Sequence, residues 1–271
     1  MITTYFVDGD KGGVGKSFVA RALSDMLMQS GRFHLPKTID DLLVVDADES
    51  NQDVCGPGGL GQPETVGACT VSGMFRPISS PEQWVTVGDQ VFEKIQEWPE
   101  DAEGRVVFSL PAGAGLAIAK AAEVTAVMAA LGAVHVWVIG TDAGSVEQLQ
   151  TRLDAFPQFY QRGFVILNLR HGRSEDFTHW NKSATREQAK EYGWREIELP
   201  VLTPSVAVDL ARTPLHRAER DKMSTNGKKL GMGSLISLKT FRGVAGERLA
   251  EMERVGQGNA VAETVDLGSM E

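Results

Sequence analysis

A glycine-rich loop between a strand and a helix constrains this chain more than any other feature. Residues 11–17 read Lys-Gly-Gly-Val-Gly-Lys-Ser; a β-rich run at 2–7 precedes them, and apolar residues at helical spacing follow from 18 to 27. Glycines let consecutive backbone N–H groups curl around an anion, because no Cβ blocks its approach. A helix N-terminus adds further N–H donors. The sequence therefore predicts a phosphate-binding loop.

Two side chains of this loop have predicted tasks of their own. Lys16 is expected to reach the β- and γ-phosphates of a bound nucleotide, and the Ser17 hydroxyl is expected to ligate Mg²⁺. The residues expected to contact the nucleotide around this loop are Gly12, Gly13, Val14, Gly15, Lys16, Ser17 and Phe18.

The remainder of the chain alternates between strands and helices. Short runs that are apolar on both faces are typical of strands buried in a parallel sheet, and they occur at 42–45, 105–110, 134–139 and 164–169. Helical stretches lie between or after these runs, at 82–97, 116–131, 145–156 and 184–192. This alternation predicts an α/β fold with a doubly wound, mostly parallel sheet and helices on both faces, in three layers.

The same alternation of strands and helices predicts the domain organisation. We expect a single domain over residues 1–256 and a flexible tail at 257–271. The segment 55–63 is dense in glycine and proline, which predicts a mobile surface loop.

Composition is that of an ordinary globular protein. The chain has 271 residues, of which 42% are hydrophobic and 23% are charged. Neither a membrane-spanning apolar run nor a signal peptide is indicated, so we expect a cytoplasmic protein. Cys55 and Cys69 have neither zinc spacing nor the number needed for a disulfide framework, and we interpret both as structural or incidental.

The glycine loop resembles the deviant Walker A motif of the ParA/MinD ATPases, in which a second lysine precedes the glycines. Asp10 stands where the ordinary P-loop has its first glycine. The resemblance implies that Lys11 contacts the phosphates bound by a partner subunit, so that ATP holds a homodimer together. A cation acts strongly on phosphate charge inside a closed, dry interface. The alternative for Lys11 is a surface lysine that contacts only solvent.

The segment 44–48 is similar to the D-x-D motif that ends a strand in this family. The resemblance implies that Asp46 lies near the metal and that Asp48 positions the attacking water. Two acids spaced i, i+2 at a strand end point the same way, so both can face one site. Asp at a strand end also forms turns, and this alternative stays open.

The segment 106–113 is similar to the third strand and switch II of the family, with one departure. Ser109 stands where the family has its Walker B aspartate. A serine cannot supply the negative charge that helps to hold a Mg²⁺-bound water, so we expect weak hydrolysis. The resemblance implies that the Gly113 N–H lies at the γ-phosphate.

The segment 165–170 is similar to a family strand that ends in asparagine. The resemblance implies that the Asn168 amide reads the adenine edge, for which its acceptor and two donors are suited. The alternative is that Asn168 forms a turn or caps a helix. The run 196–200 is similar to the last strand of the family.

A basic segment lies on an otherwise acidic chain. The net charge is −9, yet eight Lys or Arg stand against two acids between residues 212 and 242. ParA-type ATPases bind DNA nonspecifically through cations in this part of the fold, which requires no base reading. The resemblance implies DNA contacts by Arg217, Lys228, Lys229, Lys239 and Arg242; a solvated charged face without a partner is the alternative. The apolar face of 247–255 is too narrow and too acidic for membrane binding.

These features predict a ParA-like ATPase switch. It would load ATP and Mg²⁺, form a homodimer, bind DNA nonspecifically at the nucleoid and reset by slow hydrolysis that an activating partner or adaptor protein stimulates. Plasmid or chromosome partition, conjugative transfer and cargo positioning are the processes that such a switch serves. Two alternatives stay open: a nucleotide-binding regulator that barely hydrolyses, and an ATP-dependent ligase or synthetase of the same superfamily, against which Lys11 weighs.

Overall fold

A single eight-stranded sheet organises the computed structural model, which describes residues 1–9, 11–113, 122–155 and 162–256. The strands are β1 Ile2–Asp8, β2 Asp41–Asp46, β3 Glu64–Val66, β4 Cys69–Phe75, β5 Gly104–Ser109, β6 Ala133–Ile139, β7 Gly163–Asn168 and β8 Arg195–Leu199. Their order is β3-β4-β2-β5-β1-β6-β7-β8, and every pair is parallel except β3–β4. The predicted doubly wound, mostly parallel sheet is confirmed.

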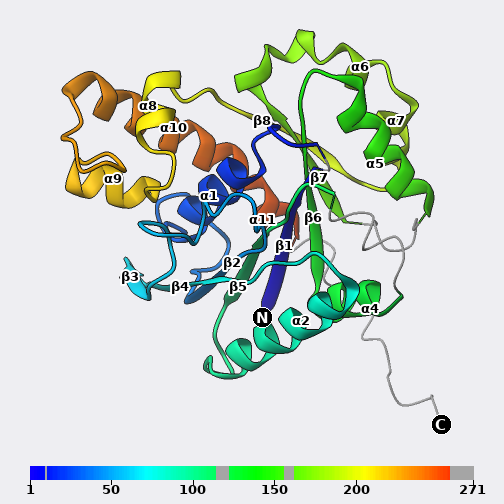
Figure 1. Ribbon diagram of the computed structural model, residues 1–271, viewed down its shortest axis with the longest axis horizontal. Helices are drawn as coiled ribbons and strands as arrows, with labels where there is room; N and C mark the ends of the chain where they lie inside the picture. The colour runs from blue at the N-terminus through cyan, green and yellow to red at the C-terminus, as the bar shows by residue number, and fades with distance from the viewer. Residues whose placement is uncertain (10, 114–121, 156–161, 257–271) are drawn as a thin grey trace.

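Helices cover both faces of the sheet, which gives three layers (Figure 1). Their bounds are α1 Lys16–Leu27, α2 Pro81–Gln96, α4 Ala122–Ala130, α5 Ala143–Ala155, α6 Thr178–Asn181, α7 Ala184–Glu191, α8 Pro204–Asp209, α9 Leu215–Asp221, α10 Met232–Leu249 and α11 Glu251–Gly256. Residues of α1 and α8–α11 share one core with the sheet, whereas α2 and α4 form a second core and α5–α7 a third. The expected helix at 116–131 lies partly outside the described residues, and the expected tail at 257–271 lies entirely outside them.

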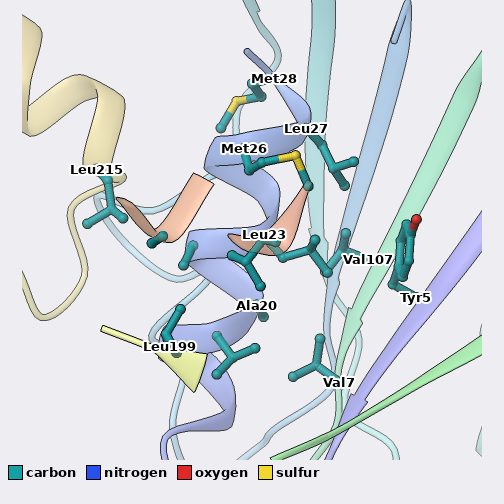
Figure 2. Packing of buried hydrophobic residues seen from close by; sticks show 14 of the residues in the cluster. Tyr5, Val7, Ala20, Leu23, Met26, Leu27, Met28, Val107, Leu199 and Leu215 are labelled. Atoms are coloured by element: carbon teal, nitrogen blue, oxygen red, sulfur yellow. The ribbon is translucent and has the colours of Figure 1, made fainter. Parts of the chain in front are cut away.

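Successive side chains of β1 point to opposite faces of the sheet, so this strand contributes to two cores. Tyr5 and Val7 face α1, whereas Phe6 lies between them and stacks on Phe108 with ring centroids 4.7 Å apart. Helix α1 is buried on nearly all sides, because the sheet lies on one side of it and α9 and α10 lie on the other. Figure 2 shows Leu23 and Met26 of this helix among the side chains of the sheet. The glycine loop therefore joins two of the most deeply buried elements.

The last helix is anchored to the central strands by a buried ionic cluster. Glu253 accepts hydrogen bonds from the Tyr5 hydroxyl at 2.7 Å and from Arg105 Nε and Nη2 at 2.7 and 2.8 Å. All three side chains are buried. The acidic character of this segment thus serves internal packing. Among the described residues, none of the helices combines the length and the apolar character that spanning a bilayer requires.

The segment 55–63 differs from its expectation as a mobile surface loop. Cys55 and Leu60 are buried in the core with α1, and Leu60 O lies so close to β4 that a Cβ on Gly73 would come within 2.3 Å of it. The glycines and prolines shape a chain path that packs its few apolar side chains inward. Strands β3 and β4 follow this segment and were not expected, because Gly73 and the polar residues of β4 interrupt any apolar run. Both cysteines are free and buried.

Candidate functional site

The glycine loop connects β1 to α1 at the carboxyl edge of the sheet. In a doubly wound sheet, ligands bind at this edge where neighbouring strands send their connections to opposite faces, and β1 and β6 form such a pair. Gly13 and Gly15 adopt φ angles of +84° and +99°, which a side chain rarely allows. A Cβ on Gly15 would lie 2.4 Å from Asn168 Nδ2, whereas one on Gly12 would meet nothing within 4 Å. The loop is therefore closed toward the protein and open toward solvent, which fits a phosphate group.

Lys16 lies across this loop. Its side chain is buried, and Nζ donates hydrogen bonds to Gly9 O at 2.9 Å and to Lys11 O at 3.2 Å. The ammonium group thereby joins the residue that follows β1 and the first residue of the loop to the start of α1. A buried positive charge in the first turn of a helix favours a polyanionic ligand at this position.

Lys11 forms an ion pair within its own subunit. Its Nζ lies 2.8 Å from Asp142 Oδ1, in the connection between β6 and α5, and both side chains are partly exposed. Burial by itself raises the pKa of Asp142, but the hydrogen bond and charge of Lys11 and the Ser145 N–H outweigh it and hold the pKa below its usual value. Sequence reasoning missed Asp142; its position three residues after the end of β6 is the signal that could have identified it.

Asp46 organises the segment that follows β2. Its carboxylate is buried, and Oδ2 accepts hydrogen bonds from the backbone N–H groups of Val54 and Cys55 at 3.1 and 3.0 Å. Among the described residues, Oδ1 accepts only the long hydrogen bond from the Asp48 N–H at 3.5 Å, so it is the oxygen with the weaker partner. Burial raises the pKa of Asp46, and these backbone donors partly oppose that rise.

Asp48 forms a turn in this structure. Its Oδ1 accepts hydrogen bonds from Ser50 N at 3.0 Å and from Ser50 Oγ at 2.6 Å. This arrangement is the turn-forming alternative that the sequence left open. The catalytic role of Asp48 stays a prediction.

Ser109 ends β5 between β1 and β2, in register with Val7 on one side and Asp46 on the other. The residue is fully buried, and its Oγ has no hydrogen-bond partner among the described residues. A neutral hydroxyl thus lies beside the Asp46 carboxylate at the edge where the glycine loop begins.

The protein atoms suited to Mg²⁺ are few. Ser17 is half-buried in the first turn of α1, and Asp46 Oδ1 is the carboxylate oxygen with the weaker partner. The described part of the chain contains no group of three or more His, Cys, Asp or Glu side chains that could hold a metal ion. The donor set fits an ion that keeps its waters and takes phosphate oxygens as its other ligands, as Mg²⁺ does.

Asn168 and His171 hold the glycine loop from the β7 side. Asn168 is buried; its Nδ2 donates to Val14 O at 2.8 Å and its Oδ1 accepts from Arg170 N at 3.2 Å, while His171 Nε2 lies 3.3 Å from Val14 O. Asn168 therefore acts as a cap in this structure, which is the alternative that the sequence left open. Adenine recognition by Asn168 stays a prediction. His171 was missed, and its position three residues after Asn168 was the available signal.

Phe18 and Gly113, two other residues expected to contact the nucleotide, have different surroundings: one is packed against a helix and the other is open. Phe18 packs against Phe241 of α10, with ring centroids 5.3 Å apart. Gly113 has a φ angle of +79°, and a Cβ there would meet nothing within 4 Å. Gly113 is therefore open to a ligand, whereas the Phe18 ring contributes to packing.

The expected DNA-binding residues do not form one cationic surface. Arg242 is buried and donates from Nε and Nη2 to Asp25 at 2.8 and 3.0 Å, and Arg217 donates from Nε to Glu64 and from Nη1 to Gly59 O, both at 2.9 Å. The buried Arg242 is therefore not presented to DNA in this structure, because internal carboxylates bind its guanidinium group, whereas DNA contact by the half-buried Arg217 stays a prediction. Lys228, Lys229 and Lys239 are exposed.

No protein-family profile matches the chain. A curated relative, protein MobD of Acidithiobacillus ferrooxidans, is 25% identical over 246 residues, which cover 89% of this chain and 93% of the relative. Among solved structures, a chain of the MinC:MinD cell division protein complex of Aquifex aeolicus aligns with a TM-score of 0.51 and 13% identity, over 96% of this chain and 98% of that one. An ATP complex of a Cyanothece McdA variant aligns with a TM-score of 0.49 and 12% identity, over 95% and 96%. The likeness to the MinC:MinD chain shows the P-loop NTPase fold.

Proposed function

The sequence and fold of this chain fit the ParA/MinD family of P-loop ATPases, and we propose that the protein is a switch that binds ATP and forms a dimer when ATP is bound. The observation that supports this most is the glycine loop, with Gly13 and Gly15 at positive φ and Lys16 folded across it. The loop provides backbone donors and a buried cation at one point. A triphosphate supplies the charge that these groups complement, and Mg²⁺ would be held by Ser17 and Asp46.

The switch itself depends on Lys11. In the described structure its ammonium group is bound by Asp142 of the same subunit. To reach the phosphates of a second subunit, Lys11 must leave this carboxylate. The ion pair is partly exposed, so the cost of breaking it is small. We infer that ligand charge in the loop competes with Asp142 for Lys11 and so links loading to dimerisation.

The exposed lysines of one turn provide a surface for DNA. Lys228 and Lys229 lie in a turn closed by hydrogen bonds between Ser224 and Lys228, with Gly227 at a φ angle of +72°. Cations presented in this way attract the phosphate backbone without reading bases. We propose that the loaded dimer binds DNA nonspecifically through this turn, in a partition, conjugative-transfer or cargo-positioning process with an activating partner protein.

A second candidate is a nucleotide-binding regulator with very slow hydrolysis. Ser109 favours it, because its buried hydroxyl brings no negative charge to the position beside Asp46. Single-turnover ATPase assays with and without DNA separate the two functions. A cycling switch hydrolyses measurably and faster with DNA, whereas a regulator shows the same negligible rate in both.

The proposal is tested by nucleotide binding and sedimentation in parallel. Lys16→Ala is expected to abolish binding of a fluorescent ATP analogue, whereas Lys11→Ala is expected to keep binding and lose ATP-dependent dimerisation. Lys190→Ala, which removes an exposed lysine paired with Glu187, is the matched control. A wild-type protein that stays monomeric with ATP, or a Lys11→Ala variant that dimerises normally, contradicts the switch.

DNA binding is tested separately by titrations across salt concentration. The wild type is expected to show a steep salt dependence only with ATP, and Lys228→Glu/Lys229→Glu is expected to flatten it. Equal weak binding with ATP, with ADP and without nucleotide would remove DNA from the proposal but leave the dimer switch intact.

A further inference from the structure

A groove of about 550 Å³ lies between α9, α10 and the turn that joins β3 to β4. It is lined by apolar residues on its α10 side and by basic residues at its rim. None of the glycine-loop residues that the structure describes lines it, so it is separate from the nucleotide site. We propose that this groove binds an acidic, amphipathic peptide segment of a partner protein.

Helix α10 provides the apolar side. Met232 and Ile236 are 74% and 59% exposed, and their i, i+4 spacing places them one turn apart on the same face of the helix. Leu235 of α10 and Val66 of β3 continue the apolar lining and are half-buried. Two large apolar side chains this exposed beside a groove are suited to hold the apolar residues of a bound helix.

The rim of the groove is cationic. Lys239 and Arg220 have side chains that are 63% and 59% exposed, and Lys222 is also exposed. Arg220 pairs with Asp221, and Lys239 lies 3.8 Å from Glu219, the one carboxylate among the lining residues. Basic side chains thus outnumber carboxylates in the lining of the groove, on a chain with a net charge of −9, which favours acidic segments at this place on the surface.

Internal ion pairs hold both walls in place. Arg242 joins α10 to α1 through Asp25, with hydrogen bonds of 2.8 and 3.0 Å. Glu64 of β3 is 2.9 Å from His216 Nε2 and accepts from Arg217 Nε at 2.9 Å, which joins α9 to the strand that leads into the β3–β4 turn. Walls fixed before binding lower the ordering cost of association, so the groove can bind a peptide without rearranging.

The apolar lining decides between a peptide and a nucleic acid. DNA needs cations alone, and a phosphate backbone over Met232 and Ile236 would leave these side chains without an apolar contact. A peptide with apolar residues on one face and carboxylates beside them satisfies both parts of the groove. The charge of the rim excludes a basic peptide for the same reason that it favours an acidic one.

The experiment measures fluorescence anisotropy with three labelled helical peptides of about 14 residues, a length that covers the i, i+3, i+4, i+7 pattern of a groove-bound helix. The first has Leu at those positions and Glu elsewhere; the second replaces each Glu by Lys; the third replaces each Leu by Ser. We expect only the first peptide to bind the nucleotide-free wild type. Ile236→Ser/Met232→Ser and, separately, Lys222→Glu/Lys239→Glu are each expected to weaken binding by about tenfold or more.

Matched controls separate the groove from the rest of the surface. Val208→Ser removes an apolar side chain that is 70% exposed on α8, and Lys190→Glu reverses an exposed charge on α7. Both are expected to bind as the wild type does. All the substituted side chains are exposed, and circular dichroism verifies that each variant is folded.

Four outcomes overturn the proposal. The glutamate peptide fails to bind the wild type, or it binds both groove variants as tightly as it binds the wild type. A DNA duplex of about 20 base pairs displaces the glutamate peptide, and its affinity falls for Lys222→Glu/Lys239→Glu but not for Ile236→Ser/Met232→Ser, which assigns the groove to nucleic acid. Sedimentation of the nucleotide-free protein shows self-association that Ile236→Ser/Met232→Ser abolishes, which assigns the groove to a second copy of the chain. Failure here leaves the proposed ATP switch untouched, because the assays contain no nucleotide.

Discussion

Lys11 Nζ and Asp142 Oδ1 lie 2.8 Å apart, so the lysine that the dimer proposal needs in a second subunit is held by a carboxylate of its own. Asp142 also accepts a hydrogen bond from Ser145 N at 3.3 Å at the start of α5. One residue thus fixes both a helix end and the lysine. Its two tasks can be separated by substitution, because asparagine caps helices as well as aspartate does.

Asp142→Asn is therefore expected to strengthen ATP-dependent dimerisation. Asparagine keeps the acceptor for Ser145 N but removes the charge that competes for Lys11. An exposed ion pair contributes up to about 1 kcal/mol, which corresponds to an approximately two- to fivefold tighter dimer. Sedimentation velocity measures the change, with Asp154→Asn on the same helix as the control. An unchanged or weaker dimer would show that Asp142 does not restrain Lys11.

Gly15→Ala is expected to destabilise the protein and to abolish nucleotide binding. The φ angle of +99° is strained for alanine, and the new Cβ would lie 2.4 Å from Asn168 Nδ2. The free energy of unfolding should fall by about 1–3 kcal/mol, as measured by urea denaturation. Gly12→Ala meets no atom within 4 Å and should leave stability nearly unchanged. Equal stabilities of the two variants would contradict this account of the loop.

Ser109→Ala is expected to raise the stability of the nucleotide-free protein. The serine hydroxyl is buried without a hydrogen-bond partner among the described residues, and such a group costs about 1–3 kcal/mol. Alanine removes it and leaves the backbone unchanged. Thermal and urea unfolding should both show a gain of about 1 kcal/mol. Ser145→Ala, which removes a hydroxyl that donates to Asp142 O at 3.2 Å, should instead destabilise. A loss of stability in Ser109→Ala would mean that the hydroxyl is satisfied in solution.

Glu253→Gln is expected to be strongly destabilising. The substitution removes the carboxylate that accepts from Arg105 at 2.7 and 2.8 Å and leaves the buried guanidinium with only the longer contact to Glu103, 3.5 Å from Nη1, among the carboxylates of the described residues. Breaking a buried pair in this way costs about 3–5 kcal/mol. Glu251→Gln, two residues earlier and exposed, is the control for helix α11. A small effect in urea denaturation would indicate that α11 is not anchored to β1 and β5 in solution.

The lowered pKa of the buried His135 makes the stability of the protein depend on pH. Burial, together with the charge of Arg152, lowers its pKa to about 3, whereas an unfolded histidine titrates near 6.5. Between roughly pH 6.5 and 3 the unfolded chain binds a proton that the folded protein does not, so stability falls as pH decreases, by up to about 1.4 kcal/mol per pH unit. His135→Gln should make this slope shallower between about pH 6 and 5. The exposed His179→Gln is the control, and identical slopes for wild type and His135→Gln would contradict the assignment.

The main elements of the fold could be predicted from sequence because their signals are local. The runs at 42–45, 105–110, 134–139 and 164–169 correspond to β2, β5, β6 and β7, with bounds that differ by at most one residue. Apolar residues on both faces of a short run leave few alternatives to a buried parallel strand. The three-residue β3 and the glycine-interrupted β4 give no such signal, and pairing at the sheet edge decides them.

Burial of charged residues could not be predicted in this way. The sequence places Arg217 and Arg242 in a basic segment with Lys228 and Lys229, and charge alone does not distinguish them. The tertiary structure brings Asp25 of α1 to Arg242, which is buried, and Glu64 of β3 to Arg217, which is half-buried. The long flexible side chains respond to whichever carboxylate the fold places nearby.

The sequence by itself determined the position of the glycine loop between a strand and a helix, because glycines at fixed positions allow backbone angles that other residues rarely adopt. It also determined that a serine and not an acid ends β5. Only the tertiary structure decided which groups meet at that loop: Asp142 at Lys11, and Asn168 and His171 at Val14. These partners come from β6 and β7, strands far along the chain that become neighbours of the loop only when the sheet assembles in its particular order.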